Sequence, residues 1–253
     1  MKKLLKRILS PKIRIQLRLL FISLKDRVKS LQTPFVQVTP ERIEAGEQLP
    51  KLFCITQPIR STTYAVNKVH NIELALTAIN NLIIYPGELF SFWRLVGEPS
   101  EAYGFKVGRS IIGETLSANV GGGLCQLSGM LYYLAIQAGI NIVERHTHSY
   151  DLYNAESRYT PLGSDATVAY GYKDLRFFNN VNIPFCFRFE LSPHKITAWL
   201  CASQALSTGR IDFEVEENEK GKFVRSYRLT AEGKREFIAE MVYKHYDSSK
   251  ESL

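Results

Sequence analysis

The chemistry of this sequence centres on a cysteine that follows three consecutive glycines. Gly121–Gly123 and Leu124 precede Cys125, and an apolar run with helical spacing follows it. Glycine tolerates sharp bends and lets other groups approach the backbone closely. At the start of a helix, free N–H groups and the helix dipole favour a thiolate over a thiol. The sequence therefore predicts that Cys125 is reactive near neutral pH.

Two clusters downstream contain the base and the acid that such a cysteine needs. His146 and His148 lie in one cluster, and Asp165 lies in the next. A Cys, a His and an Asp in this order suit a nucleophilic triad, in which the acid orients the imidazole and the imidazole takes the thiol proton. We predict Cys125 as nucleophile, one of the two histidines as base and Asp165 as its orienting acid. Gln126 is the predicted oxyanion donor, together with N–H groups of the glycine turn.

Substrate contacts are predicted around the same two clusters. Arg145 has the planar fork of donors that binds a carboxylate through two hydrogen bonds. We therefore group five residues as substrate-binding candidates: Gly122, Gly123, Glu144, Arg145 and His146.

Two alternatives use the same residues. Cys125 is a packing residue if the chain is a non-catalytic binding module, in which the glycine loop and Arg145 hold an anionic cell-envelope ligand. Alternatively, His146 and His148 bind zinc, and either Asp165 or Cys125 completes the tetrahedral site. A His-x-His pair is a weak metal signal, and the sequence contains no HExxH motif. We therefore predict no resident metal and no cofactor.

Several elements must position these residues. Apolar periodicity predicts a helix over Asn67–Ile84 and a second helix that begins near Cys125 and ends at Gly139. Leu89–Trp93 is expected to be extended, and Val107–Ile112 is expected to be a strand. A strand over Asn141–Arg145 would put His146 and His148 on one side.

The second half of the chain has the alternation of β-strands. We predict strands over residues 166–170, 175–178, 183–191 and 195–202, and three more between 210 and 245 with a hairpin turn at 219–222. Helices followed by strands give an α+β fold, with N-terminal helices packed on a mainly antiparallel β-sheet. The glycine-rich turn precedes the helix that carries the nucleophile.

The positive charge is concentrated at the N-terminus. The chain has a net charge of +7, but residues 1–30 contain ten Lys or Arg and one Asp, so this segment carries +9 and the rest carries −2. Leu, Ile and Phe alternate with these bases, and Pro11 is expected to separate two short amphipathic helices. Such a segment suits an anionic membrane surface. It matches no nucleic-acid-reading motif, so no nucleic-acid partner is expected.

Domain boundaries and location follow from these patterns. We predict a basic arm over 1–33, a proline-punctuated linker over 34–60, a core domain over 61–205 and a C-terminal β extension over 206–253. The sequence predicts neither a secretory signal nor a membrane-spanning helix. Four scattered cysteines without paired spacing indicate reduced thiols rather than a disulfide framework. We expect a cytoplasmic protein that is peripheral on the inner face of the membrane.

Four motifs in fixed order give the chain a resemblance to a known family. PGELFSFWRLVGEPSEAYGF, GGGLCQLSGMLY, NIVERHTHS and PLGSDATVAYGYKDLRFFNN resemble the VanW family, named for an accessory protein of some vancomycin-resistance clusters, over roughly residues 60–190. The resemblance implies an association with the bacterial cell envelope and glycopeptide resistance, without an established activity. It also favours His148 over His146 as the base. The motif positions are Gly122, Gly123, Cys125, Gln126, Glu144, Arg145, His148, Gly163, Asp165 and Asn179.

These observations predict a cysteine-dependent enzyme, a hydrolase or a transpeptidase. It would act by acyl transfer or amide hydrolysis on a peptide or a cell-wall precursor, with Cys125, His148 and Asp165 as the triad.

Overall fold

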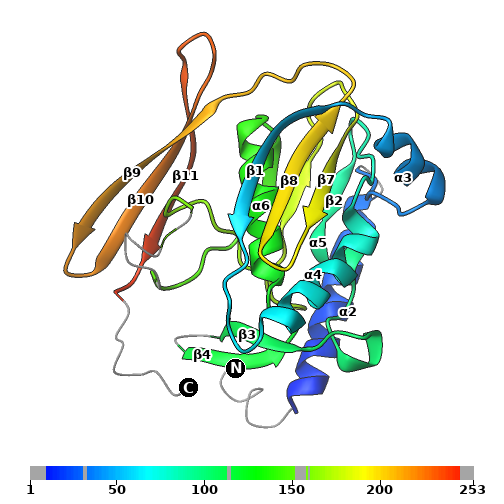
Figure 1. Cartoon of the computed structure of the whole chain (residues 1–253), viewed down its shortest axis with the longest axis vertical. Coiled ribbons are helices and arrows are strands. Elements are labelled where there is room, and N and C mark those ends of the chain that lie inside the picture. Colours follow the sequence, from blue (N-terminus) through cyan, green and yellow to red (C-terminus); the bar gives the residue numbers. More distant parts are fainter. Residues whose placement is uncertain (1–9, 31–32, 113–114, 152–157, 159, 246–253) are drawn as a thin grey trace.

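A computed structural model of the chain describes residues 10–30, 33–112, 115–151, 158 and 160–245. It contains helices and antiparallel sheets, which confirms the α+β fold (Figure 1).

The helix α6 (Leu124–Gln137) lies in the centre of the hydrophobic core. Leu127, Met130, Leu131 and Leu134 recur every three or four residues and have no exposed surface. The helix ends before Gly139, whose φ of 68° is the left-handed conformation that glycine adopts readily. The predicted helix is confirmed, and its burial holds its first turn in a fixed position.

A three-stranded antiparallel sheet packs against α6 in the order β1-β8-β7 (Figure 1). Its strands are β1 (Lys51–Pro58), β7 (Phe185–Leu191) and β8 (Lys195–Ala202). The predicted linker over residues 34–60 is therefore not a linker in the structure. It contains the helix α3 (Pro40–Glu47), capped by Thr39, and then β1, which pairs with β8 along its length.

A second antiparallel sheet has the order β2-β6-β5, with β2 (Leu89–Ser91), β5 (Asn141–Glu144) and β6 (Arg176–Phe178). Phe90 of β2 and Phe177 of β6 stack with their ring centroids 4.3 Å apart. The short helix α5 (Phe92–Val96) and the 3-10 turn η1 (Glu101–Tyr103) lead to the hairpin of β3 (Val107–Ile112) and β4 (Thr115–Val120). The hairpin delivers the chain to the glycine turn before α6.

Further predicted elements differ in the structure. Leu89–Trp93 was expected to be extended throughout, but Phe92 and Trp93 begin α5. The helix α4 (Ala65–Ile79) ends five residues before Ile84, because Asn81 has a φ of 59° and its N–H bonds to the Phe187 carbonyl. The predicted strand over 166–170 is wrong. Its backbone groups bond to separate partners instead of to a neighbouring strand. The Thr167 N–H donates to the His146 carbonyl, and the Ala166 carbonyl accepts from Ser128.

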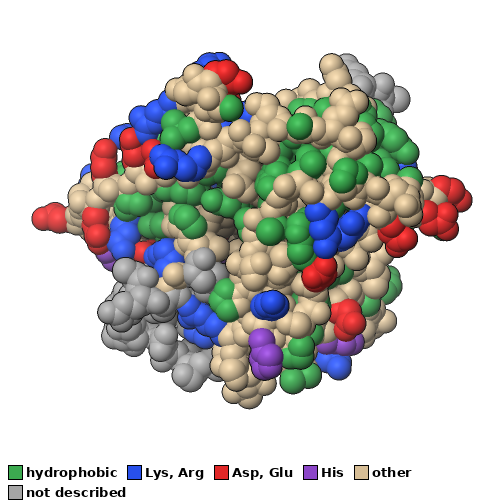
Figure 2. All heavy atoms as spheres, turned by 45° about the horizontal axis from the view of Figure 1, so that its top comes forward, with side chains coloured by type: hydrophobic (Ala, Val, Ile, Leu, Met, Phe, Trp, Pro, Cys, Tyr) green, Lys and Arg blue, Asp and Glu red, His purple; other side chains and the backbone are tan. Residues whose placement is uncertain are grey.

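The C-terminal strands form a sheet of their own, as the alternation predicts. It consists of β9 (Arg210–Asn218), β10 (Gly221–Leu229) and β11 (Arg235–Tyr243) in the order β11-β10-β9. Acidic and basic side chains alternate over the lobe on the left of Figure 2, and Arg225 pairs with Glu216 and Glu240 across this sheet. The inner face packs Val224, Met241 and Tyr243 together beside the core.

The basic segment forms one long helix, α2 (Pro11–Ser30), which starts at the proline that was expected to separate two helices. The first of those two helices falls on residues 1–9, outside the described residues. Near the end of α2, Asp26 is buried and bonds to Arg176 of β6 at 2.7 Å. None of the helices in the described ranges has the length and apolarity needed to span a membrane.

Candidate active site

Cys125 is the second residue of α6, in the first turn as the sequence predicts. Gly123 caps the helix with a φ of 106°, a backbone conformation that other residues rarely adopt. Gly122 lies against β3, where an added Cβ would be only 2.4 Å from the carbonyl carbon of Gly108. The glycines therefore let the β3–β4 hairpin approach α6, and this close contact fixes the backbone before Cys125.

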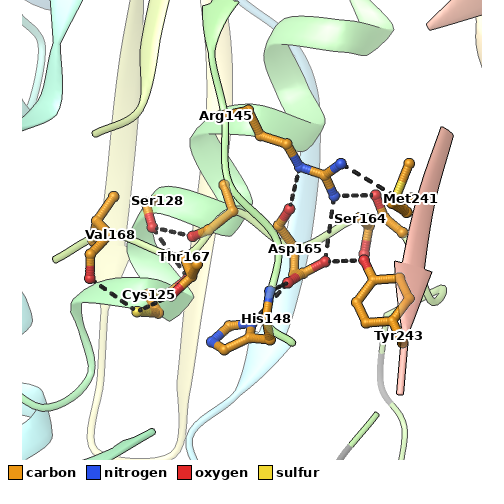
Figure 3. A network of polar contacts seen from close by, with 12 residues as sticks. Cys125, Ser128, Arg145, His148, Ser164, Asp165, Thr167, Val168, Met241 and Tyr243 are labelled. Carbon is orange, nitrogen blue, oxygen red and sulfur yellow. Dashed lines mark hydrogen bonds and ion pairs between the residues drawn. The ribbon is translucent and has the colours of Figure 1, made fainter. Parts of the chain in front are cut away.

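The Cys125 thiol lies among polar groups (Figure 3). Its Sγ is 3.4 Å from the Thr167 hydroxyl and 3.6 Å from the Val168 carbonyl oxygen. Ser128, one turn later on α6, donates to the Ala166 carbonyl at 2.6 Å and so ties the 166–168 segment to the helix. The same segment thus passes directly alongside the sulfur.

His148 and Asp165 are in direct contact. Nδ1 of His148 lies 2.7 Å from Oδ2 of Asp165, and the His148 backbone N–H donates to the same oxygen at 2.8 Å. In Figure 3 the second ring nitrogen of His148 points away from Asp165, toward the side on which Cys125 lies. The His148 side chain is 19% exposed, so the site is accessible from solvent.

Two further residues hold Asp165 from the other side (Figure 3). Arg145 donates to the Asp165 backbone carbonyl and to the Gly163 carbonyl, each at 2.8 Å, and to Oδ1 at 3.3 Å. Tyr243, at the end of β11, donates its hydroxyl to Oδ1. Both carboxylate oxygens therefore accept hydrogen bonds, which fixes the carboxylate that faces His148.

The electrostatics favour charges on all three residues. Burial opposes ionisation of Cys125, but hydrogen bonding to His148 and its positive charge outweigh burial and lower the pKa of the thiol. Burial also opposes protonation of His148, but its bonds to Asp165 and Cys125 raise its pKa to about 10. Against the effect of burial, His148 and Arg145 lower the pKa of Asp165 to about 2. At pH 7 the shifts of the last two residues correspond to an imidazolium and a carboxylate, and the lowered pKa of Cys125 favours the thiolate more than in an ordinary cysteine.

The structure places Arg145 differently from the predicted clamp on a substrate carboxylate. Its side chain is only 8% exposed, its guanidinium lies over the Tyr132 ring at 4.5 Å, and its donors are used by Gly163, Asp165 and Met241. A guanidinium with these partners positions Asp165 rather than a ligand.

Gln126 and His146 also have partners outside the group of Cys125, His148 and Asp165. The Gln126 amide donates to the Pro58 carbonyl at 3.1 Å. His146 lies 3.0 Å from Glu144, whose carboxylate also accepts the Asp174 backbone N–H. β5 ends at Glu144, so the two histidines are not placed on one side by a continuous strand.

This placement of His146 gives the zinc alternative no support. Over the described residues, no three His, Cys, Asp or Glu side chains are grouped so that they could hold a metal ion.

The sequence-based prediction missed several residues around Cys125. Lys68 of α4 packs against Gly123, where an added Cβ would be 2.7 Å from its Cγ. Burial and the nearby charges of Arg60 and Arg109 lower the Lys68 pKa to about 8. Arg109 follows Gly108, whose backbone contacts Gly122 of the glycine turn. Arg60 comes two residues after Pro58, whose carbonyl accepts from Gln126 in the first turn of α6. Cations from three separate segments thus surround the start of α6, which no spacing in the sequence indicates.

Comparisons with known proteins agree with the motifs in the site. The family model described as VanW like protein matches residues 67–201, which include Cys125, His148 and Asp165. The chain is 39% identical over 122 residues to uncharacterized protein YoaR of Bacillus subtilis, covering 48% of this chain and 39% of that protein. It is 32% identical over 141 residues to vancomycin B-type resistance protein VanW of Enterococcus faecalis, covering 56% of this chain and 51% of the relative.

The chain thus spans about half or less of the length of these curated relatives. No solved structure matches it. Because the family model covers more than half of the sequence and includes all of its central motifs, the chain belongs to the VanW family.

Proposed function

We propose that this protein is a cysteine-dependent acyl-transfer enzyme that cleaves an amide in a peptide or a cell-wall precursor. The observation that carries the proposal is the pairing of His148 with Asp165 at 2.7 Å beside a thiol whose pKa is lowered by that same histidine. A cysteine that serves only for packing has no need of an oriented imidazole, and an apolar burial site would raise its pKa.

The arrangement supports a two-step reaction. The Cys125 thiolate adds to the carbonyl carbon, and the carbonyl electrons move to oxygen to give a tetrahedral oxyanion. The oxyanion collapses, the C–N bond breaks, and the His148 imidazolium donates its proton to the leaving amine, which leaves a thioester on Cys125. Water or an acceptor amine then attacks the thioester while His148 takes the proton from the nucleophile. Hydrolysis or transpeptidation follows, according to the acceptor.

The helix start supplies the oxyanion donors in this proposal. Backbone N–H groups in the first turn of a helix lack intrahelical partners, and the helix dipole favours negative charge there. One N–H of the Gln126 amide is used by Pro58, so a role for this side chain depends on its second N–H.

The charges around the site indicate an anionic substrate. Arg60, Lys68 and Arg109 surround the start of α6, and their mutual repulsion contributes to the low pKa of Lys68. A carboxylate near the scissile amide would relieve this repulsion. One curated relative is named for vancomycin B-type resistance, and we extend an association with glycopeptide resistance and the cell envelope to this chain. The same cations would suit a non-catalytic module for an anionic envelope ligand, so the state of Cys125 distinguishes the two functions.

The test is the pH dependence of Cys125 alkylation by iodoacetamide, followed by mass spectrometry of the Cys125 peptide between pH 5 and pH 10. We expect a midpoint well below the free-thiol value of about 8.5, and a shift toward that value in His148→Ala. The exposed Cys54 reports accessibility in the same molecule, and metal content is assayed on the same preparation. Slow alkylation of Cys125 that is independent of His148 would leave the binding module as the function.

A second reagent tests the charge of the substrate. Iodoacetate carries a carboxylate and iodoacetamide does not, so the ratio of their rates at Cys125 measures attraction by the nearby cations. At low salt we expect Lys68→Met to lower this ratio by about threefold or more. An unchanged ratio would contradict an anionic substrate while leaving the proposed thiolate chemistry intact.

A further inference from the structure

The helix α2 has a continuous apolar face that is exposed to solvent. Its residues are spaced by four, three, one, three and four positions, so they cover a stripe of about 100° on one side of the helix. The exposed fractions range from 44% to 70% for the six residues Ile13, Leu17, Leu20, Phe21, Leu24 and Val28. We refer to these six residues as the α2 stripe.

The opposite face of α2 is already packed on the protein. Ile15 and Leu19 lie over Gly171, where an added Cβ would be 3.4 Å and 3.7 Å from their side chains. Asp26 is only 3% exposed and bonds to Arg176, and the Arg18 guanidinium stacks on the Tyr172 ring at 4.7 Å. In a regular helix Ile15, Leu19 and Asp26 lie about 180° from the centre of the stripe, and Arg18 lies about 110° from it. The helix is therefore held with its second apolar face turned outward.

Basic residues border the α2 stripe. On the helical wheel Arg14 and Lys25 lie along one edge and Arg27 along the other. The segment to which they belong carries +9, whereas residues 31–253 sum to −2. An apolar face between rows of bases matches an anionic bilayer, in which acyl chains accept the apolar side chains and headgroup phosphates lie beside the bases. A second copy of the chain would bring two such basic edges together.

We propose that the α2 stripe binds the surface of an anionic phospholipid bilayer, with the α2 axis in the plane of the membrane. Phe21 lies midway along the length of the stripe and is 68% exposed, so its ring offers a large apolar surface to the interface. The bases at both edges make the binding dependent on anionic lipid and on ionic strength.

The test is co-sedimentation of the full chain with two kinds of vesicle, one of phosphatidylcholine alone and one of phosphatidylcholine with about 30% phosphatidylglycerol. The second composition gives the vesicle a negative surface potential. We expect binding to the anionic vesicles only, with at least a tenfold loss in the variant Leu17→Glu/Phe21→Glu. The matched control is Val215→Glu/Phe237→Glu, which changes the net charge equally at exposed apolar positions of β9 and β11. The control should bind like the wild type.

The outcomes separate the possible occupants of the α2 stripe. Equal loss in both double variants would mean that net charge alone drives binding, and would overturn the proposal. Equal binding of wild type to both vesicle types would overturn the requirement for anionic lipid. A wild-type dimer that becomes monomeric in Leu17→Glu/Phe21→Glu, without lipid binding in either, would assign the stripe to self-association. Thermal unfolding of each variant confirms that the chain remains folded.

Discussion

The Asp165 carboxylate accepts hydrogen bonds from three residues of the site. His148 donates to it through both the ring and the backbone, and Arg145 and Tyr243 donate to its other oxygen. Such a carboxylate orients the imidazole and keeps it charged, because an opposite charge at hydrogen-bond distance favours the ionised form of each partner. The reactivity of Cys125 therefore depends on Asp165, which acts on the thiol through His148.

Acid stability should report on Asp165. Its folded pKa of about 2 is below the ordinary value of 3.8, so ionised Asp165 stabilises the fold above pH 3.8, and this stabilisation is lost as the pH falls toward 2. Asp165→Asn should lower the free energy of unfolding at pH 7 by about 3 kcal/mol and flatten its decline between pH 4 and pH 2. Urea unfolding at each pH measures both effects. A decline as steep in Asp165→Asn as in wild type would contradict this account.

The sequence predicts part of this site and misses another part for physical reasons. The order of polar clusters suggested a triad, and in the structure His148 and Asp165 are hydrogen-bonded. That the two residues meet did not follow from their order, because it depends on how the segments after α6 pack. The burial of Arg145 was not predictable, since an arginine that binds backbone carbonyls has the same sequence signal as one that binds a ligand. The positions of Lys68 and Tyr243 depend on tertiary packing across more than fifty residues of chain.

At the scale of elements, α6 is fixed at its first turn and along its buried face by different means. Its first turn meets the β3–β4 hairpin through the contact of Gly122 with Gly108, while its buried face fills the core. The apolar period predicted this helix because the period is long and regular. The segment 166–170 was mistaken for a strand because it alternates like one, although its backbone groups bond to a loop and to Ser128.

Two glycine substitutions near Cys125 should act in opposite directions. In Gly122→Ala the new methyl would lie 2.4 Å and 2.6 Å from Gly108 backbone atoms, so we expect a loss of about 1–3 kcal/mol in stability. In Gly129→Ala the nearest atoms are at 3.7 Å or more, and the better helix propensity should stabilise the fold by up to about 1 kcal/mol. Chemical unfolding of the two variants compares them directly, and a stable Gly122→Ala would mean that the hairpin and α6 can separate without cost.

At the scale of the whole molecule, the C-terminal sheet is joined to the site. Tyr243 and Met241 of β11 contact Asp165 and Arg145, and Gly163 packs against Phe213 and Val224. The three strands were predictable from their alternation and hairpin turn. Their contact with the site was not, because it depends on how the C-terminal sheet packs against the loops that contain Arg145, Gly163 and Asp165.

Tyr243→Phe should test this connection. Removing the hydroxyl deprives Asp165 of one donor, so we expect a loss of about 1–2 kcal/mol in the free energy of unfolding. The midpoint of Cys125 alkylation should move to higher pH, because a carboxylate that has lost one of its donors is held less firmly in position against the His148 ring. Tyr227→Phe, in β10 of the same sheet, is the control and should leave the alkylation curve unchanged. An identical curve in Tyr243→Phe would show that the sheet supports only folding.

The ion pair between Asp26 and Arg176 has a consequence for how the protein would meet its substrate. Because Arg176 also bonds to Asp174, pulling α2 away would leave a buried guanidinium with one carboxylate fewer, so the helix and the core move as one body. If α2 lies on lipid as proposed, Cys125 is held at a constant height above the membrane and at a constant tilt. Encounters with a substrate that is itself bound to the membrane would then take place within a plane, and the rate would follow the number of substrate molecules per unit area rather than per unit volume.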